Sequence, residues 1–176
     1  MLAAAPASPG GPSRAGAPMF YFAYGSNLDP EQMARRCPGY VRVGLAALRD
    51  HRLVFPVTSH DWGGGVAGVQ AAHGATVWGM VYDLSEEAVA ALDRYEGFRA
   101  PGDHHNLYDR EGVFVDLTRP DDGSIPRRLR AWIYVARPAN PSPPSRRYLG
   151  AIVTGARFHQ LPEEYVSGLA ATPTLD

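Results

Sequence analysis

The sequence predicts a single α+β domain built on a curled, mostly antiparallel sheet. Runs of alternating apolar residues dominate the middle of the chain, and segments with helical spacing of apolar residues occur at intervals between them. A chain of 176 residues, of which 45% are hydrophobic, is long enough for one domain with a substantial core. We therefore expect one folded unit.

The start of the chain has a different composition from the rest. Residues 1–18 are rich in Ala, Pro and Gly and lack aromatic residues and periodicity. Such a segment buries too little apolar surface to offset the entropy lost on ordering. We expect a flexible N-terminal tail at residues 1–18 and a folded domain at residues 19–176.

Charge and cysteine content narrow the choice of partners. The formal net charge is -1, with 17 basic and 18 acidic residues, which gives no indication of binding to nucleic acid or to a membrane. No apolar run approaches the roughly 20 residues of a membrane helix, and the N-terminal segment lacks the apolar region of a signal peptide. Cys37 is the one cysteine, which excludes an internal disulfide, so we expect a cytoplasmic protein. We interpret Cys37 as a structural or incidental thiol, because no histidine is expected nearby to activate it. Either a monomer or a homodimer is expected.

Residues 21–28, with the sequence YFAYGSNL, begin as a short apolar strand and end in small polar residues. Such a pattern is typical of a strand that ends at a site. Gly25 permits backbone angles closed to other residues and close approach of a ligand, and Asn27 tolerates the left-handed region. Peptide N–H groups in such a turn suit a carboxylate, a phosphate or a developing oxyanion. A turn without a ligand has the same pattern, so both interpretations stay open here.

The remaining elements follow from periodicity and capping residues. Asp29 and Pro30 predict the start of a short helix that ends near Arg36. We expect further helices at 85–96 and 146–158 and from residue 161. Strands are expected at 40–55, as two strands joined at 46–50, and at 66–70, 77–84, 108–118 and 129–135, with turns at 60–65 and 121–123.

Glu96 stands at the inward end of the helix expected at 85–96, directly before Gly97, where the chain turns. A carboxylate in this position is well placed to point into a cavity. The polar segment 99–106 follows, and we expect it to form a loop over that cavity.

Three stretches resemble the γ-glutamylcyclotransferase family and the related AIG2-like proteins. They are YFAYGSNL at 21–28, LDRYEG at 92–97 and PPSRRYLGAIVTGARFHQLPEEYV at 143–166, and they occur in the family's order. The resemblance covers nearly the whole chain from about Phe20. It implies a small, mostly antiparallel β-barrel with flanking helices and a cofactor-independent acyltransferase.

In this family the α-amine of a γ-glutamyl substrate attacks its own γ-carbonyl, which forms 5-oxoproline and releases an amine or amino acid. The match to LDRYEG implies that Glu96 is the general acid and base, and partial burial should raise its pKa. Gly25 and Ser26 are the candidate oxyanion donors. The residues expected to bind the small-molecule substrate are Tyr24, Gly25, Ser26, Asn27, Leu28, Tyr108 and Tyr148.

The resemblance leaves two alternatives open. One is a non-catalytic AIG2-like module that binds a small molecule, and the other is a cyclotransferase that removes a γ-glutamyl protecting group from a larger amine in a biosynthetic pathway. Residues 103–106 depart from the better-known eukaryotic pattern, which leaves the leaving amine open. The pairs His60-Asp61 and His104-His105 contain metal-ligand types but no spacing typical of a metal site, so we expect no metal.

Overall fold

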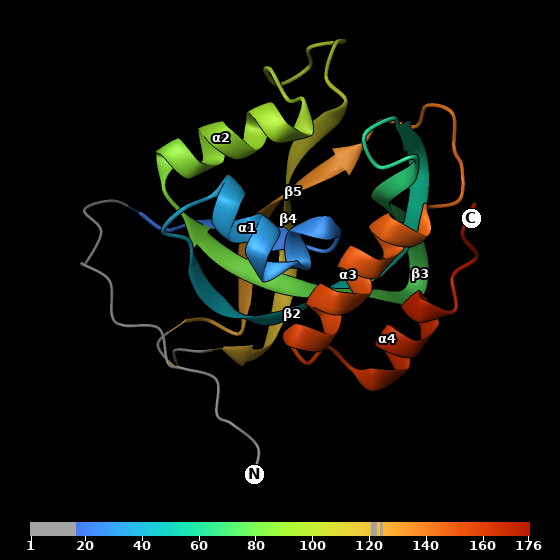
Figure 1. The fold of residues 1–176 in the computed structure, drawn as a ribbon. Coiled ribbons are helices and arrows are strands. Elements are labelled where there is room, and N and C mark those ends of the chain that lie inside the picture. The colour runs from blue at the N-terminus through green and yellow to red at the C-terminus, as the bar shows by residue number, and fades with distance from the viewer. Residues whose placement is uncertain (1–16, 121–122, 124) are drawn as a thin grey trace.

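The computed structural model describes residues 17–120, 123 and 125–176 (Figure 1). Residues 1–16 of the predicted tail lie outside this part of the chain. Asp121 and Asp122 of the predicted turn at 121–123 also lie outside it.

In the described part of the chain, five strands close into a barrel in the order β1-β3-β2-β4-β5. Neighbouring strands are antiparallel, except that β1 and β5 are parallel where Tyr21 pairs with Trp132. The strands are β1 (Met19–Ala23), β2 (Val41–Ser59), β3 (Gly64–Leu84), β4 (Tyr108–Pro120) and β5 (Arg128–Ala136). The small, mostly antiparallel barrel that the family resemblance implied is therefore confirmed.

The prediction of separate short strands at 40–55 and at 66–84 was wrong. Instead, β2 and β3 run without interruption for 19 and 21 residues and pair along most of their length. Register shifts interrupt the pairing at Arg42/Gly44, Arg49/His51 and Val54/Val57. A bulge adds a residue and bends the strand without ending it, so a break in alternation does not require a turn.

The first three helices begin within one residue of the predicted positions, and the last begins at Glu163, two residues after the predicted residue 161. The side chains of Asp29, Ser85 and Ser145 each accept a hydrogen bond from a backbone N–H in the first turn. The helices are α1 (Pro30–Arg36), α2 (Glu86–Glu96), α3 (Arg146–Phe158) and α4 (Glu163–Ala170). Figure 1 shows α3 and α4 together along one side of the barrel, while α2 lies across another side. No helix in residues 17–120, 123 and 125–176 has the length and apolar character needed to cross a membrane.

A short 3-10 helix, η1 (Ser26–Leu28), follows directly from β1 and packs against α3. The contact is close because α3 has Gly155 at this point. A Cβ atom on Gly155 would lie 2.3 Å from the carbonyl carbon of Leu28. Leu28 itself is 0% exposed, so η1 is held between the barrel and α3.

Candidate active site

The loop after β1 turns without the backbone angles that we expected. Gly25 has φ -106° and ψ -143°, outside the left-handed region, and Asn27 lies within η1 and has no positive φ. Glycine is favoured at position 25 for a different reason. A Cβ there would lie 3.2 Å from Cβ of Ala67 and 3.3 Å from the hydroxyl of Tyr148, closer than most such contacts. The backbone at Gly25 therefore lies directly against β3 and α3.

Glu96 meets this loop from the other side. It is the last residue of α2, which Gly97 ends with a left-handed φ of 66°. The Asn27 side-chain amide donates a hydrogen bond of 3.1 Å to Glu96 Oε1, across 69 positions of sequence. The structure thus brings together the glycine-bearing turn and the carboxylate, as the sequence predicted.

Side chains from α1 hold Asn27 and Glu96 in place. Gln32 donates hydrogen bonds to Ser26 Oγ at 2.8 Å and to Asn27 Oδ1 at 3.1 Å. Arg36 donates through Nη1 to Asn27 Oδ1 at 2.9 Å and to Glu96 Oε1 at 3.4 Å. Asn27 also donates to the hydroxyl of Tyr21 at 2.9 Å. These bonds occupy both ends of the Asn27 amide, so its orientation is defined before any ligand binds.

The surroundings of Glu96 shift the pKa of its carboxyl group. Its side chain is 15% exposed, and burial raises the pKa of the carboxyl group above its ordinary value. The Arg36 guanidinium and the hydrogen bond from Asn27 act in the opposite direction, because both stabilise the carboxylate. The net direction is upward, which brings the pKa of Glu96 closer to that of a useful general base.

A small inner cavity of ≈ 30 Å³ lies between Glu96 and the Gly25 turn. Tyrosines surround it, and burial raises the pKa of each of them, so their hydroxyl groups stay neutral. Its lining residues are Tyr21, Tyr24, Gly25, Ser26, Asn27, Ala67, Glu96, Tyr108, Tyr134 and Tyr148. This volume holds about one water molecule or one small polar group.

Two of the predicted tyrosines are anchored to the same residue of β3. The Tyr148 hydroxyl accepts a hydrogen bond of 2.9 Å from the Ala67 N–H, and the Tyr108 hydroxyl donates one of 3.0 Å to the Ala67 carbonyl. Hydrogen bonds from Ser26 to the Tyr148 hydroxyl lower the pKa of that hydroxyl, against the larger upward effect of burial. Tyr148 is therefore directed toward the turn that holds the candidate oxyanion donors.

A larger outer cavity of ≈ 450 Å³ continues from this point and shares Ser26, Glu96, Tyr108 and Tyr148 with the inner cavity. Its far wall is residues 57–62 at the β2–β3 turn. Among the described residues that line the two cavities, none belongs to segment 99–106. Our expectation that this segment forms a loop over the cavity was therefore wrong, because Asn106 turns the loop onto itself through bonds to Arg99 N–H and Ala100 O.

Leu28 is the predicted site residue that the structure does not bring to the others. It is 0% exposed, and its carbonyl oxygen lies 3.0 Å from Nε2 of His159. Leu28 does not belong to the described residues that line the inner or the outer cavity. Its place in the core indicates that it anchors the turn.

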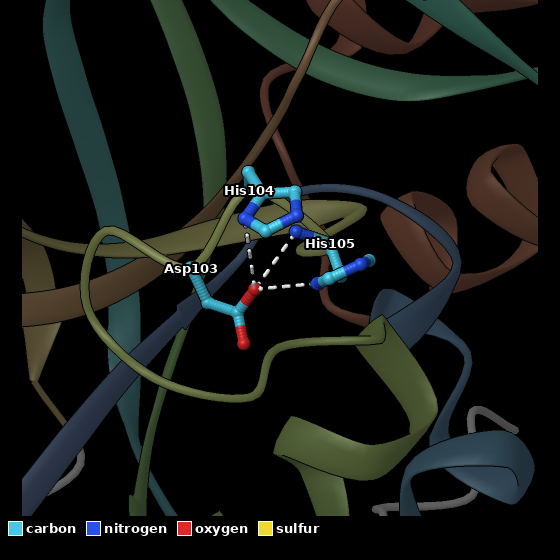
Figure 2. Close-up of side chains that lie close together, drawn as sticks. All are labelled: Asp103, His104 and His105. Carbon is cyan, nitrogen blue, oxygen red and sulfur yellow. Dashed lines mark hydrogen bonds and ion pairs between the residues drawn. The ribbon is translucent and has the colours of Figure 1, made fainter.

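Asp103, His104 and His105 form a compact group in the loop after α2 (Figure 2). Their candidate metal-ligand atoms all lie within 4.8 Å of one another, and Asp103 Oδ1 lies 3.0 Å from Nδ1 of His105. The side chains of His104 and His105 are 85% and 56% exposed. Hydrogen bonds from the His105 backbone and ring hold the pKa of Asp103 below its usual value. The group is three consecutive residues of one exposed turn, separate from the two cavities.

Comparison with known proteins finds relatives that cover most of the chain. A family model described as "Gamma-glutamyl cyclotransferase, AIG2-like" matches residues 21–154. The chain is 31% identical over 160 residues to a γ-glutamylcyclotransferase of Mus musculus, covering 89% of this chain and 79% of that protein. It is 30% identical over 155 residues to the Homo sapiens protein of the same name, covering 86% and 77%. A solved structure of a γ-glutamyl cyclotransferase superposes with a TM-score of 0.79 at 29% identity, covering 91% of this chain and 90% of that one.

Proposed function

Because the chain belongs to the γ-glutamyl cyclotransferase, AIG2-like family, we propose that it converts a γ-glutamyl amine or γ-glutamyl amino acid to 5-oxoproline and releases the free amine. The family membership makes it an enzyme of the γ-glutamylcyclotransferase type. The observation that supports the residue roles best is the hydrogen bond between Asn27 and Glu96 inside the cavity. It joins the candidate base to the turn that presents the candidate oxyanion donors.

The substrate supplies the nucleophile in this reaction. Glu96 accepts a proton from the substrate's α-ammonium group, and the free amine attacks the γ-carbonyl carbon. The new C–N bond closes the five-membered ring, and the ring nitrogen still carries a second proton. Glu96 returns the first proton to the leaving nitrogen and takes up the second proton from the ring nitrogen. The bond to the leaving nitrogen then breaks, and the released amine takes up that second proton from Glu96. The attack is intramolecular, so a correctly folded substrate gains a large effective concentration.

No nucleophile of the protein takes part in this scheme. Cys37 is 0% exposed, and burial raises the pKa of its thiol to about 11. A thiol with that pKa is protonated at neutral pH, whereas the thiolate is the reactive form. This supports our interpretation of Cys37 as a structural residue.

The oxyanion that forms at the γ-carbonyl needs hydrogen-bond donors. We assign this role to the backbone N–H groups of Gly25 and Ser26, with the neutral hydroxyls of Tyr108 and Tyr148 nearby. Glu96 Oε1 contacts Asn27 and Arg36, which leaves the other carboxylate oxygen for the substrate. The inner cavity then takes the small polar end of the γ-glutamyl group, and the leaving amine extends into the outer cavity.

The test is to incubate purified protein with a panel of γ-glutamyl amino acids and amines and to measure 5-oxoproline. We expect Glu96→Gln to lower kcat by about 10²- to 10⁴-fold, the usual contribution of a general acid and base. Glu163→Gln, an exposed glutamate at the start of α4, is the matched control and should retain full activity.

Two results would change the proposal. Glu96→Gln with full activity would contradict the acid and base role. Binding of the panel compounds without formation of 5-oxoproline by the unaltered protein would favour the alternative, a non-catalytic binding module.

A further inference from the structure

We propose that the outer cavity is a specificity site for a leaving amine with a large apolar side chain. In this proposal the apolar side chain of the amine contacts Trp62, Tyr95 and Leu107. The inference rests on the proposed function, because it places the departing nitrogen at Glu96. Glu96 lines both cavities, so a group released from it has the outer cavity directly before it.

The sizes of the two cavities indicate where the bulk of the substrate lies. The inner cavity has a volume of ≈ 30 Å³ and the outer one ≈ 450 Å³. A leaving group as small as glycine would occupy a minor part of the outer cavity and leave the rest to water. A side chain the size of phenylalanine would displace that water and bury apolar surface.

Large apolar side chains stand exposed at the rim of this cavity. Tyr95 is 59% exposed and Leu107 is 61% exposed, and both line the outer cavity. Tyr95 directly precedes Glu96, and Leu107 donates a backbone hydrogen bond of 3.1 Å to the Gly97 carbonyl. Exposed apolar residues that gather beside a candidate catalytic group are typical of a surface that a ligand covers.

Trp62 forms the opposite wall and is held in position before a ligand binds. Its carbonyl accepts a hydrogen bond from the hydroxyl of Ser145, the residue that caps α3. Its ring lies edge-on to Tyr148 at 4.9 Å between centroids, and the Arg147 guanidinium lies 4.8 Å from the ring centre. A fixed aromatic wall costs little entropy when an apolar group docks against it.

The charges at the outer cavity bear on whether the leaving group is an amino acid, which carries a carboxylate, or an amine without one. Among the described residues that line the outer cavity, Arg36 is the only arginine or lysine, and its Nη1 lies 3.4 Å from Glu96 Oε1. An amino acid that leaves from Glu96 therefore has a cation within reach of its carboxylate. Asp61 lines the same cavity and would repel a carboxylate placed near the β2–β3 turn. The apolar side chain is common to both kinds of leaving group, and substrates with and without the carboxylate separate them.

The experiment compares kcat/KM for γ-glutamylphenylalanine, γ-glutamylphenethylamine and γ-glutamylglycine. We expect the two aromatic substrates to exceed the glycine substrate by about 10- to 100-fold, the range for an apolar group that fills a pocket. A higher value for γ-glutamylphenylalanine than for γ-glutamylphenethylamine would add a carboxylate contact at Arg36.

Variants test whether the named residues cause the preference. Tyr95→Ser, Leu107→Ser and Trp62→Ala should each reduce the ratio of aromatic to glycine kcat/KM by about 3-fold or more. Phe114→Ser is the matched control for Tyr95→Ser. Phe114 is 60% exposed and has Arg128 over its ring at 5.4 Å, as Tyr95 has Arg36 at 4.9 Å, yet it lies on β4 away from both cavities.

The outcomes separate this inference from the proposed function. If all three substrates release 5-oxoproline with kcat/KM values within about 3-fold of one another, the inference is overturned and the proposed function stands. An aromatic preference that the three variants retain would also overturn it. Absence of 5-oxoproline from every substrate would overturn the proposed function and the inference with it.

Discussion

At the scale of single residues, Arg36 sets the charge balance around Glu96. Burial raises the pKa of Glu96, and Arg36 lowers it by stabilising the carboxylate. Removing the cation leaves the burial effect less opposed, so the pKa of Glu96 should rise further. In the proposed mechanism the carboxylate of Glu96 is the active form. Arg36→Gln should therefore move the acid limb of the kcat/KM profile to higher pH. A series of kcat/KM measurements from pH 4 to pH 8 checks this shift.

Arg35 provides the control for this variant. It precedes Arg36 in α1, but its side chain is 68% exposed, and the Glu31 side chain with which it forms an ion pair is 84% exposed. Arg35→Gln should leave the acid limb in place because solvent screens such exposed charges. An acid limb that stays in place in Arg36→Gln as well would mean that another group controls the pH profile.

Sequence reasoning found the residues of the site that belong to contiguous motifs and missed those that do not. Glu96 and the turn at Gly25 to Asn27 were recognisable because their neighbours in sequence carry the resemblance. Gln32 and Arg36 were missed, although their spacing of four residues places them on one face of α1. Tyr134 was also missed, because an alternating strand looks the same whether its inward tyrosine faces a core or a cavity.

At the scale of elements, the contact between α3 and η1 positions the turn. A Cβ on Gly155 would lie 2.3 Å from the Leu28 carbonyl carbon and 2.6 Å from the Asp29 nitrogen. These are backbone atoms, so Gly155→Ala must displace η1 from α3. We expect a loss of about 1 to 3 kcal/mol in the free energy of unfolding, as for an overpacked core, measured by urea denaturation. A displacement of about 1 Å at the turn should also lower kcat/KM by roughly 100-fold.

Gly150 lies in the same helix and gives the opposite expectation. Apart from its two chain neighbours and the backbone of its own helix, a Cβ at Gly150 would have no atom of the described chain within 4 Å. Gly150→Ala should therefore stabilise the protein by up to about 1 kcal/mol, because alanine has the higher helix propensity. Equal effects of the two substitutions would show that close packing at Gly155 does not determine the position of η1.

The same limit on sequence reasoning explains the error in β2 and β3. Capping residues such as Asp29 and Ser85 act within one turn of chain, and the helices predicted after them are present. The continuity of β2 past Asp50, which has a φ of 56°, depends on pairing with β3 across the sheet. Such pairing is not local, so an irregular residue in a long strand is easily read as a turn.

At the scale of the whole molecule, the closure of the barrel was predictable only from the family resemblance. Alternation within a strand reports which face is buried, whereas closure depends on a contact between β1 and β5, where Tyr21 pairs with Trp132. Closure matters for the site because the end of β1 carries the Gly25 turn and β5 carries Tyr134. The site therefore depends on the barrel as a unit, and stability of the whole fold should limit activity.

His159 makes that stability sensitive to acid. Its Nε2 lies 2.9 Å from the Tyr82 hydroxyl and 3.0 Å from the Leu28 carbonyl oxygen. A carbonyl oxygen only accepts, so Nε2 carries the proton of the neutral ring, and Nδ1 is buried without a partner among the described residues. Burial and the charge of Arg42 lower the pKa of His159 from 6.5 to about 4, despite the opposing bond to Leu28.

Between these two pKa values the unfolded chain binds a proton at His159 and the folded chain does not, so stability falls as the pH decreases. From pH 7 to pH 5 this contribution amounts to a loss of about 2 kcal/mol in the free energy of unfolding. The raised pKa of Glu96 acts in the opposite direction, because the folded chain then holds that proton more tightly.

Comparison with a variant is therefore needed to isolate the contribution of His159. His159→Gln should lose most of the acid sensitivity measured by urea denaturation at pH 7 and pH 5, whereas His104→Gln, 85% exposed, should retain it. Equal acid sensitivity in both variants would assign the effect to other groups.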